Sequence, residues 1–342
     1  MGIRIKSISY ALPEQRLTHK QLCDRFGKDI MEKVSATAGI YERRVATENE
    51  CASDFALTAA KEILKGEDIS TIDMLIFATQ TPDYLLPTPA CILQHKLNLK
   101  KDIIVFDINL GCTQFIYALS TAYAYINSGM AKKVLVLSGD TPTKLINAKD
   151  KSAISLFSDA GSACIVEYSQ KDEIINFVFG SDGAGYRDLI CETSGMRHRP
   201  KPEDFIEFED ENQNVRSNVN LFINGFKIFA FAFKTIPQTV TSLLQQSNLS
   251  QDDIDLYIFH QAGEKIVSAS AQRLGLPLEK VFFNLHDIGN CGGSSVAIAL
   301  VDAIKAGKLK AGMKVMLCAF GVGLSWGGCI IDFDELPKVT NF

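Results

Sequence analysis

Hydrophobic positions along the chain form short continuous runs that alternate with longer amphipathic stretches. The runs at 72–80 (IDMLIFATQ) and 254–261 (IDLYIFHQ) are rich in β-branched and aromatic residues and end in polar side chains, as buried strands do. Stretches such as 113–129 (TQFIYALSTAYAYINSG) have the length and spacing of helices. Strands that alternate with helices predict an α/β fold in which helices cover parallel sheets.

The order of these elements repeats, which indicates two related halves. In the first half, the strand at 72–80 is followed by a helix, a second strand, a tight turn at Gly111 and Cys112, another helix and a third strand. The second half repeats this order from 254–261, with its turn at 289–291. The other matching strand segments are 102–108 (DIIVFDI) with 281–285 (VFFNL), and 129–140 (GMAKKVLVLSGD) with 312–321 (GMKVMLCAFG). The polar segment YSQKDE marks the join, so we predict halves that comprise residues 1–172 and 173–342.

One segment interrupts this regular order. Residues 186–220 are polar and irregular and carry both charge signs, which favours a solvated loop over a cap that binds a partner. The following LFINGFKIFAFAF reads as a helix that places phenylalanines on one face. Such a face most often serves core packing or a subunit interface. The more specific alternative is that it lines an apolar substrate tunnel. The phenylalanines are Phe222, Phe226, Phe229 and Phe233.

Composition narrows the range of partners and compartments. The 342 residues include 35 Lys and Arg against 40 Asp and Glu, a net charge of −5, so no strong positive field is available to hold nucleic acid. No apolar run approaches the about 18 residues needed to cross a bilayer, and the first residues lack a leader pattern. We therefore predict a cytoplasmic protein without a membrane span. The nine cysteines include no closely spaced pair, which fits a reducing compartment and neither a disulfide framework nor a zinc site.

Cys112 is the first candidate for chemistry. In FDINLGCTQFIYAL an apolar strand leads through Gly111 into a helix, a sharp turn that presents the sulfur at the edge of the sheet. Free backbone amides and the helix dipole at the first turn of a helix stabilise a thiolate. We therefore predict a nucleophile at Cys112, although a cysteine in such a place more often serves packing alone.

Two polar residues of the second half occupy related positions. Asn290 lies in the turn that corresponds to the one at Cys112, and His260 directly follows a predicted strand. Open parallel sheets bind ligands beyond the carboxyl ends of their strands, so the three residues are candidates for one site. Each also has an ordinary interpretation, because GNCGGSS is good loop chemistry and a histidine is often a hydrogen-bonded core residue. His286 precedes the turn and is assigned a structural role.

Patterns of several other enzyme classes are absent from the sequence. It contains no GxxxxGK[ST] phosphate loop, no HExxH helix and no GxSxG elbow. The sequence therefore lacks the motifs expected for nucleotide hydrolysis, zinc proteolysis and serine hydrolase chemistry. No segment requires a metal or an organic cofactor.

Several strings in order along the chain resemble the thiolase-fold condensing enzymes, and the chain is most similar to the β-ketoacyl-acyl-carrier-protein synthase III family. The strings are SYALPEQRLT, TAGIYERRVA, GCTQFIYALSTAYAYINSG, FSDAGSA around Asp159, HQAGEKI, GNCGGSSVAIAL and AFGVGLSWGG. Together they cover nearly the whole chain. The resemblance implies a duplicated, layered αβαβα sandwich of two thiolase-like halves, usually assembled as a homodimer.

The resemblance also implies a catalytic set of Cys112, His260 and Asn290. Cys112 would attack an acyl thioester, carried by coenzyme A or acyl carrier protein, and form an acyl-enzyme. His260 and Asn290 would donate hydrogen bonds to the thioester oxygen of malonyl-acyl-carrier-protein as carbon dioxide leaves, and the carbanion would attack the acyl group. The backbone amides of Cys112 and Val322 would form the oxyanion hole. The expected role is in fatty acid biosynthesis, with acyl carrier protein as partner and no cofactor beyond these substrates.

Some positions depart from the usual pattern of the family. Where the family commonly has a tryptophan and arginines that clamp coenzyme A, this chain has Lys33, Thr37 and Lys151. Gly263 replaces the asparagine of the usual HQAN, and Lys265 stands where a carrier-docking arginine is common. We therefore hypothesise a specialised member that takes an unusual starter, already on a carrier protein, rather than acetyl coenzyme A.

Further contacts with substrate or carrier are predicted at Leu86, Phe226 and Phe229, in addition to Lys151 and Lys265. Leu86, in YLLPTPAC, matches a family position that often reaches across the dimer into the acyl tunnel of the partner. Ordinary interface packing is the alternative for this leucine.

Two other functions stay open at the level of the sequence. An acyltransferase of the same fold would move the acyl group from Cys112 to an alcohol or amine, with His260 as general base and without decarboxylation. A noncatalytic partner subunit would only dimerise with an active homologue, which the joint presence of Cys112, His260 and Asn290 disfavours. Thiolase and hydroxymethylglutaryl synthase chemistry are disfavoured because the second catalytic cysteine or glutamate of those enzymes is not evident. Cys291, next to Asn290, is interpreted as a packing residue.

Overall fold

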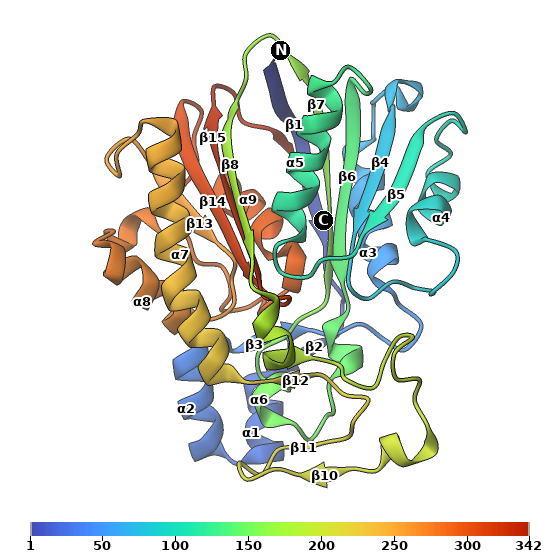
Figure 1. Cartoon of the computed structure of the whole chain (residues 1–342), viewed down its shortest axis with the longest axis vertical. Helices are drawn as coiled ribbons and strands as arrows, with labels where there is room; N and C mark the ends of the chain where they lie inside the picture. Colours follow the sequence, from blue (N-terminus) through green and yellow to red (C-terminus); the bar gives the residue numbers. More distant parts are fainter. Residues whose placement is uncertain (1, 341–342) are drawn as a thin grey trace.

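Two β-sheets stand side by side in the computed structural model, which describes residues 2–340 (Figure 1). The first has six strands in the order β16-β1-β7-β6-β4-β5, and the second has four in the order β13-β14-β15-β8. The strands of the first sheet are β1 (Gly2–Ala11), β4 (Met74–Ala78), β5 (Ile104–Ile108), β6 (Lys133–Asp140), β7 (Ala160–Ser169) and β16 (Lys338–Val339). Those of the second are β8 (Ile174–Ser181), β13 (Leu256–Phe259), β14 (Met313–Gly321) and β15 (Ser325–Phe333).

Helices form layers between and around the sheets. Two lie between the sheets, α5 (Gln114–Asn127) and α9 (Ser295–Lys305). The outer face of the first sheet is covered by α3 (Ala52–Ile63) and α4 (Pro89–Lys96), and that of the second by α7 (Gly225–Ser247) and α8 (Glu264–Leu274). The arrangement confirms the predicted α/β class and the layered thiolase-like sandwich.

Smaller elements gather at one end of the sandwich. They are α1 (His19–Phe26), α2 (Lys28–Ala38), α6 (Lys151–Ile154) and the paired strands β2 (Arg16–Thr18) and β3 (Glu42–Arg44). Leu22 and Met31 share a buried cluster with Phe157, which lies three residues before β7. Within residues 2–340, no helix combines the length and the apolar character needed to span a membrane.

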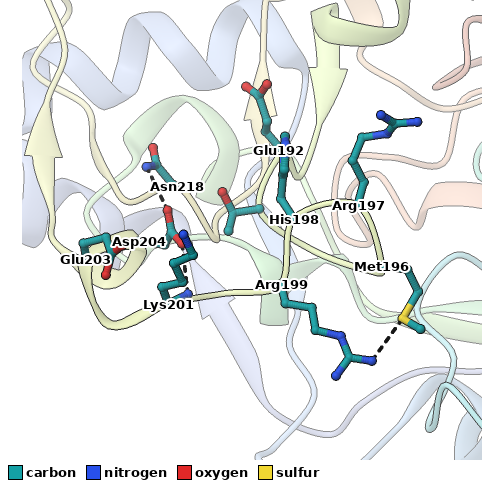
Figure 2. A pocket seen from close by; sticks show the side chains of 10 residues that line it. Glu192, Met196, Arg197, His198, Arg199, Lys201, Glu203, Asp204 and Asn218 are labelled. Atoms are coloured by element: carbon teal, nitrogen blue, oxygen red, sulfur yellow. Dashed lines mark hydrogen bonds between the residues drawn. The ribbon is translucent and has the colours of Figure 1, made fainter.

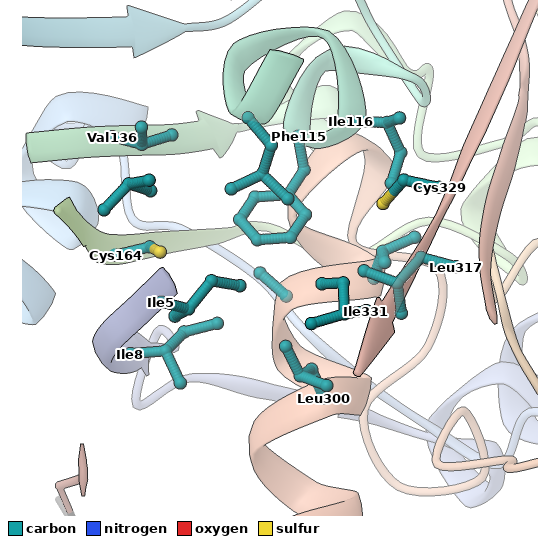
Figure 3. Close-up of a cluster of buried hydrophobic side chains, with 14 of the residues drawn as sticks. Ile5, Ile8, Phe115, Ile116, Val136, Cys164, Leu300, Leu317, Cys329 and Ile331 are labelled. Atoms are coloured by element: carbon teal, nitrogen blue, oxygen red, sulfur yellow. The ribbon is translucent and has the colours of Figure 1, made fainter. Parts of the chain in front are cut away.

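The central layer is apolar because both sheets bury side chains against it. Phe115 of α5 and Leu300 of α9 belong to one cluster with Ile5 of the first sheet and Ile331 of the second (Figure 3). Burial of such side chains from water stabilises each by about 1.5 to 3 kcal/mol. The cluster therefore fixes the positions at which α5 and α9 begin.

The sheets are mixed rather than parallel, which corrects the expectation from the sequence. β4 pairs in parallel with β5 and β6, and β13 with β14, but β7 pairs antiparallel with both β1 and β6. β14 and β15 are also antiparallel, because only residues 322–324 join them. A parallel connection needs a crossover of about a dozen residues or more.

The internal repeat is present, with one exception. β4 and β13 correspond to each other, as do β6 and β14, which follow α5 and α9 in the two halves. The predicted strand at 281–285 makes a single bridge, from Val281 to Tyr257, so within residues 2–340 the second sheet has no counterpart of β5. The chain passes from the first sheet to the second between β7 and β8, and the division at residue 172 stays a prediction.

The 186–220 segment has more structure than a loop. It contributes to two small ladders, β9 (Leu189–Ile190) with β12 (Phe222–Ile223) and β10 (Phe208–Glu209) with β11 (Val215–Arg216). Phe222 therefore lies in a strand, which corrects the helix predicted from residue 221. The helix α7 begins only at Gly225, because the Asn224 side chain caps it by accepting a hydrogen bond from the Lys227 amide.

Candidate active site

Cys112 lies in the turn between β5 and α5, just before the helix begins. Its side chain is nearly buried, with 8% of the residue exposed. The turn that ends β14 lies directly against it, since a methyl group built on Gly321 would be 2.5 Å from the Cys112 sulfur. A methyl group built on Gly111 would likewise be 2.3 Å from the Val322 side chain. Glycine at both positions allows the two halves to meet at the sulfur.

Burial decides the ionisation of Cys112. Desolvation raises the pKa of the thiol to about 11, and the charge of Asp140 acts in the same direction. Backbone hydrogen bonds from Val322 and from Cys112 itself act to lower that pKa. The thiolate expected at the helix start is therefore not the resting state, which corrects the interpretation from the sequence: amides are present, but the removal of water outweighs them. The thiol is therefore neutral near pH 7.

His260 directly follows β13, as predicted, and is 1% exposed. Its amide donates to the Cys318 carbonyl at 2.8 Å, and its ring Nδ1 lies 2.6 Å from the Ser295 hydroxyl. Burial lowers the pKa of His260 to about 3, so the imidazole is neutral at pH 7. The Ser295 oxygen accepts from the Gln261 amide at 3.4 Å, so the hydroxyl proton is available to Nδ1. This arrangement allows Nδ1 to accept the Ser295 hydroxyl proton, which is the tautomer with the ring hydrogen of His260 on Nε2.

Asn290 lies in the turn before the 3₁₀ segment Gly292–Ser294, which leads into α9. Its amide donates to the Leu156 carbonyl at 3.0 Å, and its carbonyl accepts from the Ser158 amide at 2.8 Å. The side-chain Oδ1 accepts from the Gly292 amide at 3.0 Å. With its oxygen occupied in this way, the Asn290 carboxamide presents its NH₂ group as a donor.

The three candidates lie around one junction of the two halves. Phe320, which precedes the glycine against Cys112, packs edge-on against the His260 ring with centroids 5.5 Å apart. Gly292, which holds the Asn290 side chain, lines a cavity of about 70 Å³ together with Cys112. The apolar walls of this cavity, here the acyl cavity, include Leu145, Phe157, Leu189 and Leu221. An apolar space beside a thiol suits the hydrocarbon part of an acyl group.

A second cavity, of about 470 Å³, lies among α2, α7 and α8 and is called here the lysine cavity. Five of its lining residues were singled out in the sequence, namely Lys33, Thr37, Phe229, Gly263 and Lys265. Leu156, whose carbonyl holds Asn290, and Ala262, close to His260 in the chain, also line it. The lysine cavity therefore adjoins the segments that hold both second-half candidates.

Three other predicted contacts lie elsewhere. Lys151 donates to the backbone carbonyls of Asn212 and Gln213 and is thereby tied to the 186–220 segment. Phe226 is 79% exposed, and Leu86, in the loop between β4 and α4, is 86% exposed. A single chain thus does not bring these side chains to the acyl cavity.

A third cavity, of about 580 Å³, is formed within the 186–220 segment (Figure 2). Charged side chains of both signs line it, among them Arg197, Arg199, Glu192 and Asp204. None of the predicted catalytic residues belongs to its lining. It is therefore separate from the candidate site.

Reasoning from the sequence missed two polar residues that organise the site. Ser295 contacts the His260 ring and fixes its position, although it lies in the GNCGGSS string, which could be interpreted from the sequence as an ordinary loop. Asp140 is buried at the end of β6, where it accepts from the amides of Gln80 at 2.8 Å and Gly293 at 3.3 Å. Burial raises the pKa of Asp140 to about 6. The signal in the sequence that could have identified Asp140 was its position at the end of an apolar strand.

Comparisons with known proteins agree along almost the whole chain. Residues 106–183 match the family 3-oxoacyl-[acyl-carrier-protein (ACP)] synthase III, and residues 244–333 match the C-terminal part of that family. A β-ketoacyl-[acyl-carrier-protein] synthase III of Coxiella burnetii (strain CbuK_Q154) is 36% identical over 331 residues, which cover 96% of this chain and 98% of the relative.

Solved structures give the same result. A crystal structure of a 3-oxoacyl-(acyl-carrier-protein) synthase III is 36% identical with a TM-score of 0.94, covering 97% of this chain and 100% of that one. A 3-oxoacyl-(acyl-carrier protein) synthase from Burkholderia xenovorans LB400 is 31% identical with a TM-score of 0.91, covering 99% and 97%. The chain therefore belongs to the β-ketoacyl-acyl-carrier-protein synthase III family, and it is an acyltransferase of the condensing type.

Proposed function

We propose that the chain transfers an acyl group to Cys112 and condenses it with malonyl-acyl-carrier-protein, releasing carbon dioxide. The half formed by residues 1–172 supplies the nucleophile, and the half formed by residues 173–342 supplies His260 and Asn290. The observation that carries the proposal is the meeting of a buried thiol with the β14 turn beside an apolar cavity, where Phe320 of the same strand packs on the neutral His260 imidazole.

The first step is a thioester exchange. The Cys112 sulfur attacks the acyl carbonyl, the bond to the carrier sulfur breaks, and the thiol proton ends on the departing carrier thiol. Negative charge develops on the carbonyl oxygen in the transition state, and the amides of Cys112 and Val322 are the donors for it. Because burial raises the pKa of the free thiol, these donors matter most while charge is present.

The second step uses two neutral donors. His260 carries its hydrogen on Nε2, because Nδ1 faces the Ser295 hydroxyl, and Asn290 offers its amide nitrogen. Both donate to the thioester oxygen of the malonyl group and stabilise the enolate that forms as carbon dioxide leaves. The enolate carbon then attacks the acyl carbonyl, the bond from that carbonyl to the Cys112 sulfur breaks, and the departing thiolate takes a proton from solvent to regenerate the neutral thiol. The product is a β-ketoacyl group that is two carbons longer than the starter.

The lysine cavity supports a proposal for the starter. Lys33 and Lys265 face the same space from α2 and α8, together with Thr37 and Phe229. Two ammonium groups suit the phosphate of a pantetheine arm, whereas no aromatic pair is placed there to stack an adenine ring. We propose that the starter arrives on a carrier protein.

Mass spectrometry with a panel of starters tests this function. The chain is supplied with malonyl-acyl-carrier-protein and with acyl groups on either coenzyme A or acyl carrier protein. We expect one carbon dioxide for each product and faster turnover of at least one carrier-bound starter than of acetyl coenzyme A. Acyl transfer to an alcohol or amine without carbon dioxide would refute the condensation. Turnover of acetyl coenzyme A equal to or faster than that of every carrier-bound starter would refute only the proposed starter.

A homodimer is supported by the open edge of the first sheet. β5 lies at that edge, and all its residues are only partly buried, unlike the fully buried β4 beside it. The nearby loop exposes three large apolar side chains, Tyr84, Leu85 and Leu86, by 58%, 74% and 86%. An unpaired edge strand and exposed apolar residues both favour a second copy as the covering partner.

The nine free thiols fit a cytoplasmic location.

Changing Leu86 tests whether it reaches the acyl cavity of the partner. Leu86→Ala is expected to shift preference toward longer starters and Leu86→Phe toward shorter ones, by about tenfold in relative kcat/KM. Competition between acyl thioesters of graded length measures the shift. Leu85→Ala is the matched control, since that neighbour is also exposed but is not predicted to line the cavity. Unchanged preference in both Leu86 variants would leave only interface packing for this side chain.

A further inference from the structure

Two buried hydroxyl groups connect the turn of Cys112 with the turn of Val322. Thr113, the residue after the nucleophile, is 0% exposed, and Ser325, the first residue of β15, is 3% exposed. Their side-chain oxygens are 2.9 Å apart. The Ser325 oxygen also lies 2.9 Å from the carbonyl oxygen of Val322. We refer to Thr113 and Ser325 as the hydroxyl bridge.

The number of protons fixes the direction of both hydrogen bonds. A carbonyl oxygen can only accept, so Ser325 donates its single hydroxyl proton to Val322. Ser325 must then accept from Thr113, whose proton is otherwise free. Thr113 is also the N-cap residue of α5, so the bridge is anchored on the helix that follows the nucleophile. It crosses from the first half of the chain to the second.

The turn at the far end of the bridge is held from two sides. Leu324 exchanges backbone hydrogen bonds with Asp182 of the second sheet's edge, at 2.8 and 3.2 Å. On the other side, Ser325 holds the Val322 carbonyl, and the preceding residue, Gly321, lies against the Cys112 sulfur, which brings the Gly321–Val322 peptide unit beside that sulfur. The Val322 carbonyl and the Val322 amide belong to consecutive peptide units, so the bridge holds the turn that carries this amide and acts on the amide through that turn.

We propose that Thr113 and Ser325 are positioning residues that aim the Val322 amide at Cys112 and at the oxyanion formed during acyl transfer. This inference rests on the proposed function, because it concerns the same acyl-transfer step. Neither hydroxyl touches the reacting atoms, and both act through Val322. A hydrogen-bond donor held in advance costs no reorganisation when charge develops, which is how such a bridge accelerates a reaction.

Removing either hydroxyl tests the bridge. Thr113→Val keeps the shape of the side chain and removes its proton donor, and Ser325→Ala removes the central oxygen. For each variant we expect the kcat of acyl transfer to Cys112 to fall about tenfold with little change in KM, which corresponds to about 1.4 kcal/mol. The pH at which iodoacetamide alkylates Cys112 is expected to rise, since the thiolate loses a well-aimed donor. The double variant should be hardly slower than either single one.

Three controls separate positioning from damage to the fold. Thr113→Ser retains a hydroxyl and should restore both acyl transfer and the alkylation profile. Decarboxylation of malonyl-acyl-carrier-protein without a starter should change less than twofold, because it depends on His260 and Asn290. Thermal unfolding shows whether each variant is folded.

Several results would overturn the inference. They are acyl transfer within twofold of wild type in folded Thr113→Val and Ser325→Ala, a Thr113→Ser variant as slow as Thr113→Val, or an equal loss of decarboxylation. If the wild-type chain forms no acyl-enzyme at all, the proposed function fails instead, and the alkylation profile still decides whether the bridge positions Val322.

Discussion

Cys112→Ala is expected to leave no acyl group on the protein and to lower condensation by at least about a thousandfold. Without the sulfur no acyl-enzyme forms, and the remaining donors have only the malonyl group to act on. Intact-mass measurement after incubation with the starter panel detects the missing adduct, and analysis of β-ketoacyl products measures the rate. Release of carbon dioxide from the malonyl donor is expected to persist, because His260 and Asn290 are unchanged.

Cys291→Ala is the matched control for this experiment. Cys291 is also fully buried and lies beside Asn290, but its sulfur belongs to a small apolar cluster with Ala160 and Ile298. Its acyl adduct and its product spectrum should match those of the wild type. An acyl group that survives in Cys112→Ala, or that disappears only in Cys291→Ala, would show that Cys112 is not the nucleophile.

Gly321→Ala is expected to lower acyl transfer by at least about a hundredfold, since displacement of reacting atoms by about 1 Å has effects of that size. The added methyl group would lie 2.5 Å from the sulfur and 2.6 Å from Cβ of Cys112. Both distances are far below van der Waals contact, so the Cys112 turn, the β14 turn or both must move apart. The rate of acyl-enzyme formation measures this effect directly.

Gly183→Ala provides a comparison in which the same methyl group meets nothing within 4 Å. It should change neither acyl transfer nor the midpoint of thermal unfolding appreciably. If Gly321→Ala transferred acyl groups at the wild-type rate while remaining folded, the close contact between the two halves at the sulfur would have no part in the reaction.

Local patterns in the sequence predicted most elements of the sandwich. The apolar runs at β4, β6, β13 and β14 are buried on both faces and so carry a continuous hydrophobic signal. The direction of β15 has no such signal. It follows from the short connection after Gly321, a constraint of length that becomes visible only once both strand ends are located. The fully covered β4 and the half-covered β5 also look alike as sequences.

The candidate site, like the fold, could be predicted from the sequence only in part. Cys112, His260 and Asn290 were predicted because each follows a recognisable strand or precedes a helix. Ser295 and Thr113 were not singled out, because a hydroxyl in the first turn of a helix is common and its partner comes from a distant segment. The neutral state of the thiol was also missed, since desolvation depends on the side chains of both halves.

The contact between Gly321 and Cys112 has a consequence for biosynthesis of the enzyme. Cys112 is translated early, but the backbone that faces its sulfur belongs to β14 and the turn before β15, which are translated near the end of the chain. A nascent chain on the ribosome therefore carries an unfinished pocket until translation is almost complete.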